Sequence, residues 1–423
     1  MTDRDQELEA LLARMTRTRV NRRGFLAGTG FAGLAAFLAA CSGGSSSSPA
    51  SVAPSAAAPS AAASASEAAA ASESAAASAF PSAVAVTETE GKLFMYNWAD
   101  YVDPDNIEKF KKDFKVDEFT YDIFSSNEEM MTKLQGGATG QYDIGAPTAE
   151  FVDAMVQGGF LEKIDWTKLP NAAFIDPQFQ QFYKGDKADL NNYHLPKDWG
   201  TTGIALRTKD VKEDVKTWKD FFDVAPKYSG RIVVVNSPGD VFVAPLKALG
   251  YSLNSVDPTE LGKAKELLLG LAPHVLALDS DTYDAKLADE SAVMGLVWTG
   301  GIDDMKEKPE TKDIKYVIPE DGTLYWMDTW VIFKNPPHPN SAYAWLNFIQ
   351  DPAVQAKETV TNRYATANLE AIKLVPKDLL NNPTVFVPDD VLKSGLLEGA
   401  QDVSTDPLRV QIWEEFTQKI GKK

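Results

Sequence analysis

The sequence predicts an α/β protein whose residues 91–423 form two lobes. In this region, short apolar runs of strand length alternate with segments whose apolar residues recur at helical spacing. Repeated strand–helix units of this kind give parallel sheets that are covered by helices on both faces. The region holds about 330 of the 423 residues, more than the roughly 100–200 residues of a typical domain. A cleft between two lobes is a common place for a small ligand.

The first 40 residues have the pattern of an export signal. A basic cluster around Arg22 and Arg23 precedes an apolar run from Phe25 to Ala40. This run is shorter than the ~20 residues of a membrane span but has the length of a signal-peptide core. The arginine pair resembles a twin-arginine export signal, although Asn21 and Ala27 differ from the usual residues of that motif. We therefore predict a twin-arginine signal peptide.

The apolar run ends in Leu38-Ala39-Ala40-Cys41, which resembles the lipobox of bacterial lipoproteins. Small residues before the cysteine let signal peptidase act, and the thiol then receives the lipid. Cys41 is the only cysteine of the sequence, so a disulfide framework is excluded. We predict that Cys41 is the lipidated first residue of an exported chain, held at the periplasmic or cell-surface face of the membrane.

Residues 41–90 are predicted to be a disordered tether. They consist almost wholly of Ser, Ala, Gly and Pro. Such a composition buries too little apolar surface to offset the entropy of ordering the chain. The tether would keep the folded region near a membrane while leaving it soluble.

The elements of the folded region follow in order. The run 92–96 predicts a buried strand, and Asp103-Pro104 then supplies an N-cap and a first-turn proline for a helix. We predict further strands at residues 118–124, 143–146, 203–207, 231–235, 293–298, 314–318 and 329–333, and further helices at 127–134, 149–157, 257–269, 341–350, 351–360 and 406–420.

Composition and motifs exclude several functions. The sequence has 60 acidic and 42 basic residues, which argues against nucleic-acid binding and fits a positively charged partner. One cysteine and three histidines leave little for a metal site, and we expect neither a metal nor a cofactor. The sequence contains no Gly-x-Ser-x-Gly, no phosphate-binding loop and no His-Glu-x-x-His. We expect no enzyme, although a glycosidase needs only two carboxylates and stays open.

Aromatic residues adjoin acidic residues at the ends of three predicted strands. A single tryptophan is more often part of the core, but three such places in an acidic chain favour a binding site. Aromatic faces attract ammonium groups and cover methylenes, and carboxylates pair with the charge. The pattern therefore predicts a site for a flexible organic cation. The residues are Trp98, Asp100 and Tyr101, then Trp298, then Trp326 and Asp328.

Long blocks of the sequence resemble the spermidine/putrescine-binding proteins of bacterial ABC importers. The blocks stand in order and cover nearly all of residues 91–423. They include LFMYNWADYVDPDNIEKFKKDF, LPKDWGTTGIALR, GRIVVVNSPGDVFVAPLKALGYS, GLVWTGG, GTLYWMDTWVIF and NRYATANLEAIKL. The resemblance implies a two-lobed type II periplasmic-binding-protein fold that closes like a clamshell. We expect lobe 1 at 91–204 plus 327–371, and lobe 2 at 205–326 plus 372–423.

The resemblance also implies the ligand-binding residues. Acidic residues at three positions match acidic residues of the family that contact the amines of the ligand. They are Asp100, as in putrescine-type members, Asp240, and the central Asp328 of the Trp-x-Asp motif. Thr148 matches a serine that contacts an amine, and it also has the position of an N-cap for the next helix. Aromatic walls are implied at Trp98, Tyr101, Trp298, Trp326 and Tyr364.

Two positions depart from the spermidine-type pattern. Ser237 stands where that pattern has an acid, and Glu150 stands where it has a tyrosine. Glu150 either adds a carboxylate to the site or is a first-turn acid favoured by the helix dipole. The preferred polyamine therefore stays open.

The function implied is capture of a polyamine between the lobes and its delivery to the membrane permease of an ABC importer. We expect a monomer that acts without chemistry, cofactor or nucleic acid. One alternative is the same fold binding another amine-bearing solute, such as an opine or a thiamine-like compound. An alternative from another class is a secreted two-carboxylate glycosidase.

Overall fold

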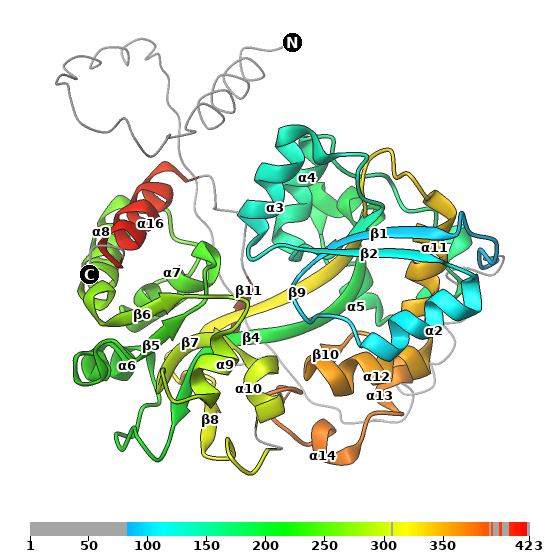
Figure 1. The fold of residues 1–423 in the computed structure, drawn as a ribbon. Helices are drawn as coiled ribbons and strands as arrows, with labels where there is room; N and C mark the ends of the chain where they lie inside the picture. Colours follow the sequence, from blue (N-terminus) through cyan, green and yellow to red (C-terminus); the bar gives the residue numbers. More distant parts are fainter. Residues whose placement is uncertain (1–82, 306–307, 389–390, 392–396, 400–405, 421–423) are drawn as a thin grey trace, which may run out of the picture. The chain divides into compact units, whose positions relative to one another are not determined.

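The computed structural model describes residues 83–305, 308–388, 391, 397–399 and 406–420 (Figure 1). The predicted signal peptide, Cys41 and the tether up to residue 82 lie outside these residues. Among the helices that the structure describes, none has both the length and the apolar character needed to cross a bilayer.

The described strands form one continuous mixed sheet with the order β2-β1-β3-β9-β4-β7-β5-β6. Strand β8 and strand β10 pair with β4, and β11 pairs with β9. The strands are β1 (Lys92–Asn97), β2 (Glu118–Ile123), β3 (Ile144–Gly145), β4 (Leu195–Arg207), β5 (Ile232–Val234), β6 (Val275–Leu278), β7 (Met294–Trp298), β8 (Ile314–Val317), β9 (Thr323–Ile332), β10 (Ala365–Thr366) and β11 (Leu397–Gly399).

Helices cover this sheet, and short 3-10 turns connect several of them (Figure 1). The α-helices are α2 (Pro104–Phe114), α3 (Asn127–Lys133), α4 (Val152–Gln157), α5 (Pro177–Gln180), α6 (Trp218–Val224), α7 (Pro238–Ala248), α8 (Pro258–Leu271), α9 (Tyr283–Ala288), α10 (Thr299–Met305), α11 (Pro339–Ile349), α12 (Pro352–Asn362), α13 (Leu369–Ile372), α14 (Lys377–Leu380) and α16 (Pro407–Ile420).

Local sequence signals set the start and end of the first helix. The side chain of Asp103 accepts hydrogen bonds from the backbone N–H groups of Asp105 and Asn106, and Pro104 occupies the first turn. Helix α2 ends where Lys115 adopts a left-handed conformation with φ 54°. The predicted cap at Asp103 is confirmed.

The prediction of parallel sheets is right for part of the molecule and wrong for its centre. Strand β1 runs parallel to β2 and β3, and β5 runs parallel to β6 and β7. Strands β4 and β9 instead run antiparallel to each other. In addition, β4 pairs antiparallel with β7 and β9 with β3. Two long antiparallel strands thus connect the two halves of the sheet.

Both connecting strands are longer than the sequence pattern predicted. Strand β4 begins at Leu195 instead of 203, and β9 begins at Thr323 instead of 329. Lys197 and Asp198 interrupt the apolar run, which hid the first half of β4 from a periodicity argument. All the residues of β4 are nevertheless buried.

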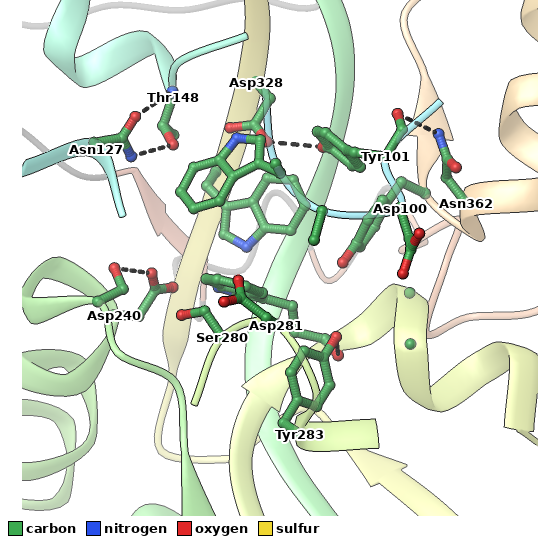
Figure 2. Close-up of a pocket in the computed structure, with 18 of the residues that line it drawn as sticks. Asp100, Tyr101, Asn127, Thr148, Asp240, Ser280, Asp281, Tyr283, Asp328 and Asn362 are labelled. Atoms are coloured by element: carbon green, nitrogen blue, oxygen red, sulfur yellow. Dashed lines mark hydrogen bonds between the residues drawn. The ribbon is translucent and has the colours of Figure 1, made fainter. Parts of the chain in front are cut away.

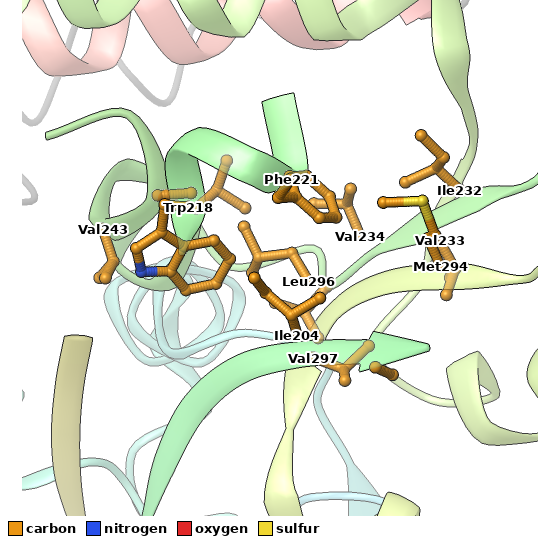
Figure 3. Packing of buried hydrophobic residues seen from close by; sticks show 14 of the residues in the cluster. Ile204, Trp218, Phe221, Ile232, Val233, Val234, Val243, Met294, Leu296 and Val297 are labelled. Atoms are coloured by element: carbon orange, nitrogen blue, oxygen red, sulfur yellow. The ribbon is translucent and has the colours of Figure 1, made fainter. Parts of the chain in front are cut away.

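The two halves of the sheet have separate hydrophobic cores, which define two lobes (Figure 1). Lobe 1 holds β1–β3 with α2–α5 and α11–α13, and lobe 2 holds β5–β8 with α6–α10 and α16. The lobe 2 core packs Trp218 and Phe221 of α6 against Ile204 of β4 and Leu296 of β7 (Figure 3). In lobe 1, the rings of Phe110, Trp345 and Phe348 form a comparable cluster. Each lobe therefore gives its pocket-facing loops a rigid base.

Candidate functional site: an acidic, aromatic pocket between the lobes

A pocket of about 450 Å³ lies where the ends of β1, β6 and β7 meet β9 and the start of α7 (Figure 2). This volume is within the range of pockets that enclose small organic ligands. All ten ligand-binding residues predicted from the sequence lie on its wall. They are Trp98, Asp100, Tyr101, Thr148, Glu150, Asp240, Trp298, Trp326, Asp328 and Tyr364.

The charge of the pocket wall is wholly negative. Eight carboxylate residues line the pocket, and no lysine, arginine or histidine is among the described residues that line it. Carboxylates that share a pocket repel one another unless a cation or protons enter. The pocket is therefore suited to a cationic ligand. The eight residues are Asp100, Glu128, Glu150, Asp240, Asp281, Asp284, Asp304 and Asp328.

Four of these acids were missed by the sequence analysis. Asp281 and Asp284 follow β6, a strand that was not predicted, and Glu128 lies in the first turn of α3. Asp304 lies in α10, whose start is the Trp298-Thr299-Gly300-Gly301 motif. The rule that ligands bind beyond the carboxyl ends of strands would have found Asp281 if β6 had been recognised.

Asp328 lies in the middle of β9 and is buried at the pocket wall. Its Oδ2 atom lies 2.7 Å from the Tyr101 hydroxyl oxygen, within hydrogen-bond distance, while Oδ1 has no partner among the described residues (Figure 2). Burial and the neighbouring charge of Asp198 raise the pKa of Asp328 to about 7. One carboxyl oxygen of Asp328 is thus buried at the pocket wall without a hydrogen-bond donor.

A buried charged layer lies behind Asp328. Lys197 and Asp198 are only 2% and 3% exposed, and Lys197 Nζ lies 2.6 Å from Asp198 Oδ2. The same ammonium group lies 3.3 Å from the centroid of the Tyr101 ring. The Tyr101 hydroxyl oxygen is also within hydrogen-bond distance of Asp198 Oδ1. This layer is not evident from the sequence, because two charged residues interrupt the apolar pattern of the strand.

The hydrogen-bond partners of Asp240 differ from those of Asp328. It lies in the first turn of α7, and its two carboxyl oxygens accept hydrogen bonds from the Thr202 hydroxyl and, at 2.6 Å, from the Ser237 hydroxyl. Burial raises the pKa of Asp240, and the hydrogen bonds from Ser237, Thr202 and Trp298 oppose that rise. Ser237, which replaces an acid of the spermidine-type pattern, therefore serves here as a donor to Asp240.

Aromatic rings cover the pocket wall between the two acids. Trp98 of lobe 1 packs edge to face against Trp298 of lobe 2, with ring centroids 5.6 Å apart. The ring of Tyr364 packs against Trp326 at 4.9 Å and against Tyr101 at 5.7 Å. These rings offer apolar and π surfaces to the carbon chain and to the charge of an organic cation.

Two glycines make this aromatic packing possible. A Cβ atom on Gly200 would lie 2.7 Å from the Trp326 ring, and one on Gly300 would lie 2.5 Å from the Tyr364 ring. Real Cβ atoms essentially never approach that closely. Gly300 of the Trp-Thr-Gly-Gly motif is therefore needed for the close approach of both the Asn362 backbone oxygen and the Tyr364 ring.

Thr148 and its neighbours complete the lobe 1 side. Thr148 has the N-cap position of a short 3-10 helix, but its side chain makes no capping hydrogen bond. Its hydroxyl instead accepts a hydrogen bond from the Asn127 side chain at 2.8 Å (Figure 2). Glu150 lies in the first turn of that 3-10 helix and also lines the pocket. Asp100 has a φ of 50°, a conformation that aspartate tolerates better than most residues.

Comparison with known proteins agrees with this architecture. Residues 105–387 match the family model of the bacterial extracellular solute-binding proteins. The chain is 31% identical over 344 residues to a spermidine/putrescine-binding periplasmic protein of Escherichia coli, covering 81% of this chain and 95% of that one.

Two solved structures are similar over nearly their whole length. A structure described as a spermidine/putrescine ABC transporter from Listeria monocytogenes is 30% identical, with a TM-score of 0.70 over 79% of this chain and 99% of the other. A lipoprotein of Treponema pallidum is 26% identical, with a TM-score of 0.64 over 78% and 99% of the two chains. The chain therefore belongs to the bacterial extracellular solute-binding proteins and has their type II periplasmic-binding-protein fold, in a family of binding proteins and not of enzymes.

Proposed function

We propose that this protein captures a polyamine of the putrescine and spermidine type between its lobes and delivers it to the permease of an ABC importer. The observation that carries the proposal is a pocket lined by eight carboxylate residues and five aromatic residues of the predicted site, with no cationic side chain among the described lining residues. The names of the relatives support the same ligand class.

The ligand-binding roles follow from the positions of the side chains. Asp328 and Asp240 would each take an ammonium group, and Asp100 and Glu150 would add negative charge. The rings of Trp98, Tyr101, Trp298, Trp326 and Tyr364 would cover the methylenes. Thr148 would contact an amine through its hydroxyl. Enclosure of the ligand removes water, which strengthens each of these charge pairings.

Delivery requires that the ligand favour a closed form of the two lobes. A ligand can shift this equilibrium only through its different affinities for the open and closed states, so it must contact both lobes. Asp328 and Tyr101 belong to the lobe 1 side of the pocket, whereas Asp240 and Trp298 belong to the lobe 2 side. We propose the lobe limits 91–204 plus 327–371 and 205–326 plus 372–423.

The chain belongs to an extracellular family and is therefore exported. We propose that residues 1–40 are a twin-arginine signal peptide and that Cys41 carries the lipid that anchors a monomeric binding protein to the membrane. The Treponema relative, which is a lipoprotein, supports this anchor. Metabolic labelling with a lipid precursor tests it, because Cys41→Ser should abolish the label and release the protein from the membrane fraction.

Calorimetric titration of the mature chain with putrescine, cadaverine, spermidine and spermine tests the ligand class. We expect saturable binding at micromolar concentration or tighter for at least one of them, and loss of that binding in Asp328→Asn. An absence of heat and of any thermal shift with all four polyamines would reject the ligand class. The search would then move to other amine-bearing solutes of the same fold.

A further inference from the structure

The Tyr101 hydroxyl lies between two buried carboxyl groups. Its oxygen is within hydrogen-bond distance of Asp198 and of Asp328, the latter at 2.7 Å. A phenol has one hydrogen and can donate it to only one of them. The second contact is a hydrogen bond only if that carboxyl group carries a proton. With both carboxyl groups ionised, two oxygens without a hydrogen between them would face each other away from water, which is costly.

The surroundings of the two carboxyl groups decide which one holds this proton. The second oxygen of Asp198 lies 2.6 Å from the Lys197 ammonium group, which can only donate hydrogen bonds. Asp198 is therefore the carboxylate of the pair. The second oxygen of Asp328, a residue that lines the pocket, is buried and has no hydrogen-bond partner in the described part of the chain. The proton belongs on Asp328, which then donates to Tyr101 while Tyr101 donates to Asp198.

We propose that the unliganded protein holds a proton on Asp328, and that the ammonium group of a ligand displaces this proton when it binds. The O–H bond of the carboxyl group breaks, the proton leaves to water, and the carboxylate pairs with the ligand's ammonium group. Lys197 and Asp198 are the positioning residues, because they assign the proton to Asp328 without touching the ligand. The inference rests on the proposed function only in that the ligand carries an ammonium group.

Charged and titratable groups face Asp328 and its supporting layer from several elements. Burial and Asp198 raise the pKa of Asp328 to about 7, and Tyr101, Lys197 and Thr148 oppose that rise. Glu358 of α12 is also buried, and burial raises its pKa to about 7 while Lys197 opposes the rise. Burial and neighbouring charges raise the pKa of Tyr101 and of Tyr364, so both phenols keep their protons at neutral pH.

The sign of the pH dependence follows from this assignment. Below pH ~7 the unliganded protein carries the proton and must release it to bind, so affinity falls as pH falls, by up to about tenfold per pH unit. Above pH ~7 Asp328 is already ionised, so affinity is nearly independent of pH. The amino groups of a polyamine stay charged throughout this range.

Titration of the full protein with putrescine in phosphate and in Tris buffer at pH 6 measures the released proton directly. The two buffers take up protons with different enthalpies. At pH 6 we expect the observed binding enthalpies to differ by the difference between the protonation enthalpies of the two buffers, which corresponds to about one proton released per ligand. The difference should approach zero at pH 8.5. Identical enthalpies at pH 6 together with an affinity that is flat from pH 5.5 to 8.5 would overturn the proposal and leave polyamine binding intact.

Two isosteric variants separate positioning from a structural role. Asp198→Asn removes the neighbouring negative charge and frees the Tyr101 proton for Asp328. It should therefore lower the midpoint of the pH dependence by about one unit or more and reduce the proton release at pH 6. Glu358→Gln is the matched control, because it removes another buried acid that Lys197 influences and should leave the release unchanged. Loss of the release in Glu358→Gln would show that the proton comes from Glu358 and would overturn the assignment to Asp328.

The proton on Asp328 can also be measured without a ligand, so this test does not depend on the proposed polyamine ligand. The infrared spectrum of the unliganded protein at pH 6 should contain a carbonyl band of a protonated carboxyl group that is missing in Asp328→Asn. If no polyamine binds at all, the proposed ligand class is rejected. The infrared band then still shows whether Asp328 carries a proton. If the spectra of the protein and of Asp328→Asn do not differ in this band, the proposal is wrong.

Discussion

The two acids at the pocket wall, Asp328 and Asp240, are buried to a similar degree but are stabilised by different chemistry. Asp240 lies at the start of α7, where neutral hydroxyl groups donate to both of its oxygens. Asp328 lies in mid-strand, with one oxygen bonded to Tyr101 and a layer of buried charges behind it. One end of the pocket therefore has an acid with hydrogen bonds to both oxygens, and the other end has an acid with one buried oxygen that lacks a partner among the described residues.

The difference between Asp240 and Asp328 shows two ways in which a pocket can stabilise a carboxylate that binds a cation. Fixed neutral donors and a helix N-terminus stabilise negative charge without needing a counter-ion. Buried charges act at longer range and make the protonation state of one group depend on the others. The ligand thus gains different amounts of free energy at the two ends.

The largest expected effect comes from removing the charge at each end in turn. Asp328→Asn should weaken putrescine binding by about a hundredfold or more, because loss of one partner of a buried charge pair costs roughly 2–5 kcal/mol. Asp240→Asn should weaken it by about tenfold, because its oxygens already have donors. Calorimetry gives both values, with folding checked by thermal unfolding. Equal losses in the two variants would contradict the comparison.

The next effect concerns the aromatic wall that joins the two ends. The methyl group of Gly300→Ala would clash with the backbone oxygen of Asn362 and lie 2.5 Å from the Tyr364 ring, so the backbone at Asn362 and the ring must shift. Overpacking of this kind costs about 1–3 kcal/mol, and we expect about a tenfold loss of affinity together with a lower melting temperature. Thermal unfolding and calorimetry measure the two effects.

Gly262→Ala is the matched control for this change. Gly262 lies inside α8, and a Cβ atom there would meet nothing within 4 Å. Replacing a glycine inside a helix with alanine should stabilise the protein by about 0.5–1 kcal/mol and leave affinity unchanged. If Gly300→Ala behaves like this control, Tyr364 is not held by the contact that the structure shows.

A smaller effect is expected from the donors at the Asp240 end. Ser237→Ala removes the hydroxyl that donates to Asp240 at 2.6 Å and should weaken binding by about three- to tenfold. Because this hydrogen bond lowers the pKa of Asp240, its loss raises that pKa further, so the defect should grow as pH falls. Affinity measured from pH 5 to pH 8 checks the trend. Ser280→Ala, at another pocket serine, should leave the trend unchanged.

Sequence reasoning found the ligand-facing side chains better than the layer that supports them. Trp98, Asp328 and Trp298 adjoin apolar strands, so their positions follow from strand periodicity and the resemblance. Lys197 and Asp198 contradict the apolar pattern of a buried strand, and only the packing of Tyr101 and α12 shows why they are tolerated. The antiparallel path of β4 and β9 depends on pairing between distant segments, which local pattern does not determine.

The smallest expected effect lies at the mouth of the pocket, where a hydrogen bond joins the two lobes. The Ser125 hydroxyl, just after β2, donates to Asp281 Oδ2 at 2.8 Å, just after β6. This hydrogen bond is exposed to solvent. Ser125→Ala should therefore cost only about 0.5–1 kcal/mol of the closed state and speed ligand release by about two- to fivefold. Stopped-flow measurement of the release rate is the direct test. Thr132→Ala removes a hydroxyl that bonds only within α3 and should change nothing. A release rate that is equal in both variants would mean that closure depends on the ligand contacts at the two acids and not on this bond.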